Sequence, residues 1–363
     1  MFVHCPGNRE QLNLLTAYVD GSNIYGSEQT EADDLRAHDG HLRGFLATSD
    51  GPIHPELPIS TAAGEGEAAC NNDGDDNFPC HQAGDFRVNE QPGLASMHTL
   101  WVREHNRVAG ELVQNHGYQD DTEASSNELH HAARRIVIAE YQNIVYNGYL
   151  RSFMDAKIFD DFKLNSCMDG SCSYDDSLNP SITNEWGIAN RTIETAVTEN
   201  LFRSDVRNAF DLAALNIQRG RDHGVSYCAT RKALGLKVPA TFQEAENMQL
   251  FSRETIALLE SCYDNICDID LFTAIVAERP LRTRTNLPIK SDSPIAETLN
   301  HIQGDMYRKL KLGDRFWYEF QRAGLNGDQK RAIGRVTMST IICDNVLTEG
   351  GDIQPDAFLV EGL

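Results

Sequence analysis

The apolar positions of this chain predict helices far more often than strands. In the clearest stretch, apolar residues recur three, four or seven positions apart: Leu94, Met97, Trp101, Val108 and Leu112. This spacing places them on one face of an amphipathic helix of about six turns. The pair Pro92-Gly93, directly before this stretch, predicts a turn.

Three further helices follow from the same kind of pattern. One is expected near residues 127–150 and another near 190–203. Ser293 followed by Pro294 predicts the start of a third, because a capping residue before a proline is typical of a first helical turn. Residues 61–80 and 165–185 are rich in loop-forming residues, and strand signals are sparse. We therefore expect a mainly α fold. The helix near 127–150 has this predicted apolar face: Leu129, Ala133, Ile136, Val137, Ile144 and Val145.

The charge balance excludes two classes of partner. The 363 residues include 54 acidic and 32 basic side chains, which gives a formal net charge of −22. Such a chain has no overall basic footprint for nucleic acid, and anionic membrane surfaces should repel it. No apolar run reaches the length of a membrane-spanning helix.

The cysteines indicate an oxidising compartment. Nine are present, and three close pairs predict small disulfide loops: Cys70/Cys80, Cys167/Cys172 and Cys262/Cys267. Asn190 begins a glycosylation acceptor triplet. The first residues show no signal peptide, so we expect that the N-terminus of a secreted protein is missing here. The alternative is a cytosolic protein with reduced cysteines.

Residues 16–22 form a first candidate for chemistry. Oxygen-bearing side chains alternate here, at Thr16, Tyr18, Asp20 and Ser22. On an extended or turning segment they point to one side, and with a backbone carbonyl they could hold a hard cation such as calcium. The alternative is a half-buried strand with a polar, wet face, which the single carboxylate favours.

Two further segments concentrate polar side chains. In residues 83–91, Arg87 and Glu90 are three apart and could share a face of a helical turn. A charged arginine in a cleft can polarise a bound peroxide, whereas the alternative is a surface ion pair. Residues 211–224 end a short apolar run in amide, guanidinium and acidic groups, which could bind carboxylates or phosphates. The alternative there is a buried ion network that ties helices together.

The histidines do not indicate a zinc site. His98 and His105 are seven apart on one predicted helix, and we expect them to pack. No His-Glu-x-x-His or Cys-x-x-Cys motif occurs, so zinc is not predicted. A Gly-x-Ser-x-Gly element and a phosphate-binding glycine loop are absent as well.

Taken in order, these segments resemble the animal haem peroxidases, the group of myeloperoxidase, lactoperoxidase, thyroid peroxidase and peroxidasin. The resemblance covers nearly the whole chain and implies one peroxidase-like helical domain over residues 1–363. It implies haem b and calcium as cofactors, and hydrogen peroxide with a halide or small organic donor as substrates. It also implies a secreted protein with a role in oxidative stress. The matching stretches are residues 15–27, 83–90, 96–107 and 215–224, with weaker matches at 180–185, 313–318 and 341–345.

The resemblance assigns roles to single residues. Arg87 is similar to the distal arginine that polarises peroxide, and Glu90 to the carboxylate that esterifies a haem methyl. Asn216 is similar to the asparagine that bonds the proximal histidine, and Arg219 to a partner of a haem propionate. Cys70/Cys80 resembles a family disulfide, and His223 belongs to a structural ion network. Four residues resemble the family's calcium loop: Thr16, Tyr18 through its main chain, Asp20 and Ser22.

Two blocks of the family pattern have no counterpart. The distal histidine element lies upstream of the calcium loop, where this chain has not yet begun. Residues 183–186, which precede the proximal histidine in the family, run straight into residues 187–190, which resemble a much later stretch. No histidine occurs between His131 and His223. We therefore expect an internal deletion near 186–187, truncation at the N-terminus, weak or absent haem ligation and lowered stability. The alternatives are a non-enzymatic secreted protein in adhesion or pairing, and an incomplete gene product.

Overall fold

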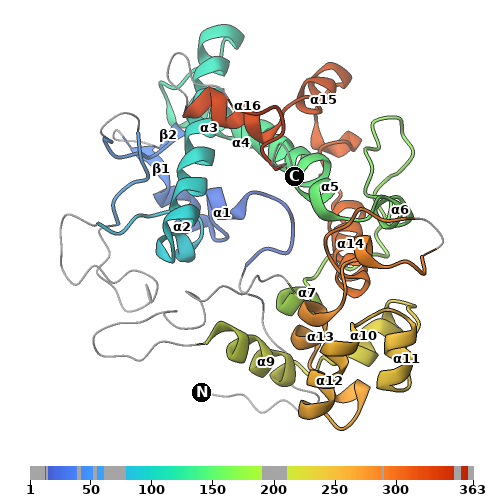
Figure 1. The fold of residues 1–363 in the computed structure, drawn as a ribbon. Coiled ribbons are helices and arrows are strands. Elements are labelled where there is room, and N and C mark those ends of the chain that lie inside the picture. The colour runs from blue at the N-terminus through green and yellow to red at the C-terminus, as the bar shows by residue number, and fades with distance from the viewer. Residues whose placement is uncertain are drawn as a thin grey trace. The chain divides into compact units, whose positions relative to one another are not determined.

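The computed structural model confirms a mainly helical chain (Figure 1). It describes residues 13, 15–38, 42–51, 55–60, 79–189, 211–287, 290–346 and 353–358. Within these residues the sheet structure is one antiparallel pair of short strands and four isolated bridges. The helix expected near 190–203 and the acceptor Asn190 lie outside the described residues.

The chain divides into two compact units, each built from separate stretches of sequence. The first, here called the α3–α4 unit, comprises Tyr18–Ser152, Ser166–Tyr174 and Arg315–Leu363. The second, here called the α14 unit, comprises Met1–Ala17, Phe153–Asn165 and Asp175–Asp314. The single domain expected over residues 1–363 stays a prediction.

The α3–α4 unit is organised around two long helices that pack against each other and against strand β2. Its elements are α1 (Ser22–Tyr25), α2 (Gln29–Asp34), β1 (Arg36–His38), β2 (Leu42–Leu46), η1 (Phe86–Asn89), α3 (Pro92–His116), α4 (Glu123–Ile144), the π-helix η2 (Val145–Tyr149), α5 (Leu150–Phe153, whose last residue belongs to the other unit), η5 (Gln321–Ala323), α15 (Gly327–Ile333) and α16 (Met338–Asn345).

Helix α3 begins earlier than the sequence predicts. The expected turn at Pro92-Gly93 is wrong, because both residues belong to the first helical turn. Proline is tolerated there since its missing N–H has no partner in a helix anyway. The Gln91 side chain caps the end by accepting from the Gly93 N–H at 3.1 Å. Gly117, with φ 75°, ends the helix in the left-handed region.

The predicted apolar faces of α3 and α4 are largely the buried ones. Trp101, Val108 and Leu112 lie in the core, but Met97 is 42% exposed and its predicted burial is wrong. On α4 the buried members of the face are Leu129, Ala133, Val137 and Ile144. A capping box between Thr122 and Ser125 starts α4 at Glu123, before the predicted residue 127.

The α14 unit consists of shorter helices around α14. Its elements are α6 (Ala156–Asp161), α7 (Asn184–Ala189), α9 (Leu212–Asp222), α10 (Tyr227–Ala233), α11 (Phe242–Asn247), α12 (Arg253–Cys262), η3 (Ile266–Asp268), α13 (Leu271–Ala277), η4 (Leu281–Thr283) and α14 (Glu297–Leu312).

The helix start predicted at Ser293-Pro294 is wrong. Helix α14 begins at Glu297, after an uncapped Ala296. Ser293 instead orders the approach to the helix: its hydroxyl donates to the Phe153 carbonyl at 2.7 Å and accepts from the Asn300 amide at 2.9 Å. A hydroxyl before a proline therefore serves a tertiary contact here.

The disulfides follow the prediction in part. Cys167–Cys172 is confirmed. Cys262/Cys267 is wrong, because Cys267 in η3 is bonded to Cys228 on the packed helix α10, which leaves Cys262 as an exposed thiol. Closeness in sequence misled the prediction, since the tertiary packing of α10 selects the partner. Cys80 is disulfide-bonded, and its predicted partner Cys70 lies outside the described residues.

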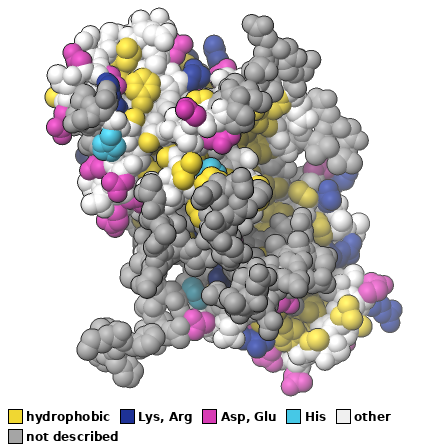
Figure 2. Space-filling model, turned by 90° about the vertical axis from the view of Figure 1, so that its left-hand side faces the viewer, with side chains coloured by type: hydrophobic (Ala, Val, Ile, Leu, Met, Phe, Trp, Pro, Cys, Tyr) yellow, Lys and Arg dark blue, Asp and Glu magenta, His cyan; other side chains and the backbone are white. Residues whose placement is uncertain are grey.

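The described helices and surface can be compared with the partners that the charge balance excludes, membranes and nucleic acid. Among the described residues, no helix combines the length and apolar character that crossing a membrane requires. On the face drawn in Figure 2, acidic side chains are spread among polar and apolar ones rather than gathered in one patch. The visible surface thus indicates no single charged docking site.

Helix α14 depends on a glycine where the Phe162 ring packs against it. A Cβ on Gly304 would lie 2.4 Å from Phe162 Cδ2, so an added methyl must displace the ring. We expect Gly304→Ala to lower the free energy of unfolding by about 1–3 kcal/mol, as overpacking does. Urea unfolding followed by circular dichroism measures this change.

Gly110 on α3 is the matched control, because a Cβ there meets nothing within 4 Å. Gly110→Ala should raise the unfolding free energy by up to about 1 kcal/mol through helix propensity alone. Equal effects of the two substitutions would contradict the contact between Phe162 and Gly304.

Candidate functional site

The segment predicted to hold calcium is a series of bends that leads into α1. Asp20 Oδ1 accepts from the Ser22 N–H at 3.0 Å, and the Gln142 side chain on α4 donates to the Val19 carbonyl at 2.8 Å. Tyr18 is 42% exposed. The structure therefore brings Asp20 and Ser22 together in an anchored turn rather than along a strand.

Metal-binding groups are sparse around this turn. The described part of the chain contains no cluster of three or more His, Cys, Asp or Glu side chains that could hold a metal ion. Thr16, the fourth predicted ligand, belongs to the α14 unit, whereas Tyr18, Asp20 and Ser22 belong to the α3–α4 unit. A cation here would depend on one carboxylate and neutral oxygens, and calcium stays a prediction.

Arg87 lies in η1 and is held by its neighbour Asp85. The Asp85 carboxylate caps η1 and accepts from Arg87 Nε at 2.9 Å and Nη2 at 2.5 Å. Burial alone would raise the pKa of Asp85, but the hydrogen bonds from Arg87 hold that pKa below its usual range. The bond to Asp85 in turn raises the pKa of Arg87. The guanidinium is thus oriented by a bidentate contact, with 46% of the side chain exposed.

Glu90 lies directly after η1, where its N–H donates to the Arg87 carbonyl at 2.9 Å. Its side chain is half-buried. Arg87 forms its ion pair with Asp85, two residues earlier in the chain, and the charge of Glu90 also raises the pKa of Arg87. Glu90 and Arg87 remain close through the backbone of the same short turn.

A buried imidazole lies in the electrostatic environment of this turn, and the sequence assigned it only a packing role. Burial lowers the pKa of His98, against the charge of Asp85 and a hydrogen bond to the Asn23 backbone. His98 Nδ1 is buried and has no hydrogen-bond partner among the described residues. The signal that could have found it is its position on the first turns of α3, directly after the Arg87 segment.

Helix α9 presents the second group of predicted residues. Asp211 caps it by accepting from the Ala213 N–H at 2.8 Å. Asn216 is only 2% exposed, and its Nδ2 has no partner among the described residues. Arg219, three residues later and so on the same face, is exposed. One helix face therefore combines a buried amide without a partner and an exposed guanidinium.

The C-terminal end of α9 is tied to neighbouring helices, but the network is not the buried one expected, because the Arg221 side chain is 62% exposed. Arg221 donates to both carboxylate oxygens of Asp270, at 2.9 and 2.8 Å, and this bond lowers the pKa of Asp270. His223 Nδ1 lies 2.8 Å from Asn184 Oδ1 on α7. The contacts of His223 thus include a hydrogen bond to the segment that precedes 186–187.

His105 packs in the core, as predicted. Its Nδ1 lies 2.9 Å from the Tyr25 hydroxyl and its Nε2 lies 2.9 Å from the Gly44 carbonyl oxygen. The His130 ring lies 5.0 Å away, measured between centroids. Burial lowers the pKa of His105 to about 4 and that of His130 to about 2, so both imidazoles are neutral in the folded chain near neutral pH.

The predicted residues are divided between the two units. Arg87, Glu90, Tyr18, Asp20 and Ser22 belong to the α3–α4 unit, and Asn216, Arg219 and Thr16 to the α14 unit. Within their units, Arg87 and Glu90 share a turn and Asn216 and Arg219 share a helix.

A family model described as animal haem peroxidase matches residues 3–196 and 187–358. The human peroxidasin homolog is 31% identical over 415 aligned positions, which include 97% of this chain and 26% of that protein. Human myeloperoxidase is 29% identical, with 94% of this chain and 52% of that protein covered. The chain thus spans about a quarter to a half of the length of these relatives.

Solved structures support the fold. Peroxidase A from Dictyostelium discoideum superposes with a TM-score of 0.73 at 23% identity, covering 96% of this chain and 72% of that one. A fatty acid alpha-dioxygenase from Oryza sativa superposes with a TM-score of 0.62 at 16% identity, covering 94% and 66%. At these identities the similarity concerns the fold alone.

The low pKa values of the buried imidazoles predict that the folded state loses stability in acid. Because the pKa of His105 falls from 6.5 to about 4 on folding, the unfolded chain binds more protons between these values. The unfolding free energy should therefore fall as the pH drops from 6.5 towards 4. His105→Gln, which can keep both hydrogen bonds, should reduce this fall by about 3 kcal/mol.

His116→Gln is the control, since His116 is exposed at the end of the same helix. Urea unfolding at several pH values compares the three proteins. An unchanged pH profile in His105→Gln would contradict a neutral, buried His105.

Proposed function

Because the chain belongs to the animal haem peroxidase family, we propose that it carries the framework of a secreted peroxidase. The complete reaction reduces hydrogen peroxide with electrons from a halide or small organic donor, in a response to oxidative stress. Haem b supplies the redox chemistry when bound. The disulfides Cys167–Cys172 and Cys228–Cys267 support an extracellular location, where such bonds persist.

Several residues that the resemblance assigns to haem binding have side chains that suit those roles. The buried amide of Asn216 has no partner among the described residues, which supports a role in binding an imidazole or another group. The exposed guanidinium of Arg219 suits a propionate. Arg87, oriented by Asp85, would polarise peroxide, and the half-buried Glu90 would offer a carboxylate for an ester link.

The iron ligand does not fit. Helix α7 (Asn184–Ala189) occupies the stretch that precedes the proximal histidine in the family, and it contains no histidine. None occurs anywhere between His131 and His223. This observation carries our proposal: the 363 residues ligate haem weakly or not at all and have little peroxidase activity.

An internal deletion near 186–187 would explain the missing ligand. Two observations support it. The family model matches in two stretches that overlap over residues 187–196, and the alignment with the human relative has 415 positions, more than the 363 residues of this chain. Helix α7 runs continuously through Trp186 and Gly187, and the Trp186 indole N–H donates to Gln303 on α14 at 3.0 Å. The junction is thus a packed helix rather than a frayed loop.

Titration with haem, followed by visible absorption, tests the proposal. We expect no saturable shift of the Soret band in a chain that circular dichroism shows to be folded. A saturable shift that moves again on addition of peroxide would overturn the proposal. His98 and His223 would then be the ligands to replace by alanine, because both His105 nitrogens already contact the Tyr25 hydroxyl and the Gly44 carbonyl.

Restoring the segment that contains the proximal histidine should restore haem binding, which is the matching gain-of-function test. We would insert the proximal-histidine segment of the human peroxidasin homolog between Trp186 and Gly187, with and without its histidine. The insert should produce a saturable Soret shift that the histidine-to-alanine version lacks. Equal behaviour of the two inserts would show that the missing histidine does not limit haem binding.

We further propose that the turn at residues 16–22 binds calcium weakly. The support is the anchored geometry of Asp20 and Ser22 and the preference of Ca²⁺ for carboxylate, hydroxyl and carbonyl oxygens. Ligands that bind only the folded state raise its stability with concentration. We therefore expect millimolar calcium to raise the melting temperature.

Asp20→Asn should abolish this rise, and Asp50→Asn should preserve it, because Asp50 is an exposed carboxylate in the same unit. Differential scanning fluorimetry with calcium and with magnesium provides the measurement. The same rise in all three proteins would contradict a site at Asp20.

A further inference from the structure

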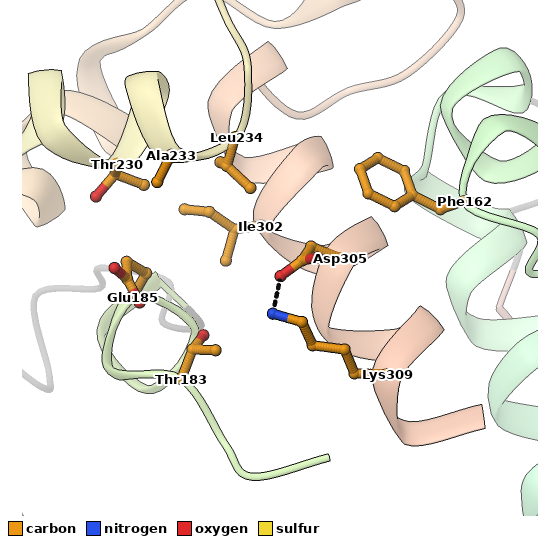
Figure 3. A pocket seen from close by; sticks show the side chains of 9 residues that line it. All are labelled: Phe162, Thr183, Glu185, Thr230, Ala233, Leu234, Ile302, Asp305 and Lys309. Atoms are coloured by element: carbon orange, nitrogen blue, oxygen red, sulfur yellow. Dashed lines mark hydrogen bonds and ion pairs between the residues drawn. The ribbon is translucent and has the colours of Figure 1, made fainter. Parts of the chain in front are cut away.

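A pocket in the α14 unit is lined by none of the residues to which the resemblance assigns a role in haem or calcium binding. Its volume is about 340 Å³, and it lies among α7, α10, α14 and Phe162 (Figure 3). That volume suits a small organic molecule. All of its described lining residues belong to the α14 unit.

One side of the pocket is apolar and fixed. Phe162, Leu234 and Ile302 contribute side-chain carbon to this side. The Phe162 ring packs against Gly304, where no Cβ would fit, and contacts the His301 ring edge-on at 5.8 Å between centroids. A bound molecule would therefore meet a preformed hydrophobic wall, which lowers the cost of ordering the site.

The charged lining carries one more negative than positive group. Asp305 and Lys309 on α14 form an ion pair at 2.6 Å. Figure 3 shows Glu185 on α7, across the pocket from this pair. Among the described residues Glu185 has no ion-pair partner, and its side chain is half-buried. The pocket thus contains one carboxylate that no lining cation neutralises.

Thr230 on α10 also lines the pocket, and its hydroxyl oxygen is buried.

From these features we propose that the pocket binds a small organic cation: a primary ammonium on a short aromatic or aliphatic body. The ammonium would neutralise Glu185 and the body would cover the Phe162–Ile302 wall. A carboxylate ligand would face the excess negative charge, and a neutral one would leave Glu185 unneutralised. The net charge of −22 also raises the local concentration of cations. The proposal needs neither haem nor calcium.

Isothermal titration calorimetry of the full chain tests it with three matched probes: 2-phenylethylamine, 2-phenylethanol and phenylacetate. We expect the amine to bind at least tenfold more tightly than the alcohol, and phenylacetate not to bind. Equal binding of amine and alcohol, or no binding of the amine at millimolar concentration, would overturn the proposal.

Two substitutions locate the binding. Glu185→Gln should weaken the amine at least tenfold, whereas Glu260→Gln, at an exposed site on α12 in the same unit, should leave it unchanged. Ala233→Leu fills the pocket from α10 without changing its charge, and should abolish binding. Amine binding that survives both Glu185→Gln and Ala233→Leu would belong to the general acidic surface and would refute the site.

Discussion

The α3–α4 unit depends on a buried carboxylate. Glu104 on α3 is fully buried and accepts from Arg107 Nη2 at 2.5 Å and from Asn345 Nδ2, at the end of α16, at 2.6 Å. Burial and the nearby charge of Glu104 raise the pKa of Glu140 on α4. Losing one partner of such a buried charge is costly, because the other is left uncompensated. The Glu104 carboxylate therefore ties α3 to the end of α16, and the turn that contains Arg87 precedes the same helix α3.

Sequence periodicity could predict the long helices, because α3 and α4 each bury one apolar face and the spacing of apolar residues reveals that face. It could not predict features decided by tertiary contacts. The sequence predicts a turn at Pro92, but Gln91 caps a helix whose first residue is Pro92. Ser293 resembles a cap but bonds to Phe153 and Asn300. Cys267 lies five residues from Cys262 in sequence, yet it forms a disulfide with Cys228, because α10 packs against η3.

The candidate residues came from a resemblance, and the structure adds the contacts that a motif does not contain. The orientation of Arg87 depends on Asp85, within the matched segment but without an assigned role. The buried amide of Asn216 and the buried Nδ1 of His98 have no partner among the described residues, which only coordinates can show. The absence of any histidine between His131 and His223, on which the proposed loss of haem ligation rests, can be read from the sequence alone.

The proposed loss of haem ligation requires that no histidine of this chain binds the haem iron. Resonance Raman spectroscopy of reduced haem mixed with the folded chain tests it most directly, because a band from an iron–imidazole bond reports the axial ligand itself. The account predicts a spectrum without that band. A clear iron–imidazole band that disappears when one histidine of the chain is replaced by alanine would contradict the account and identify the ligand.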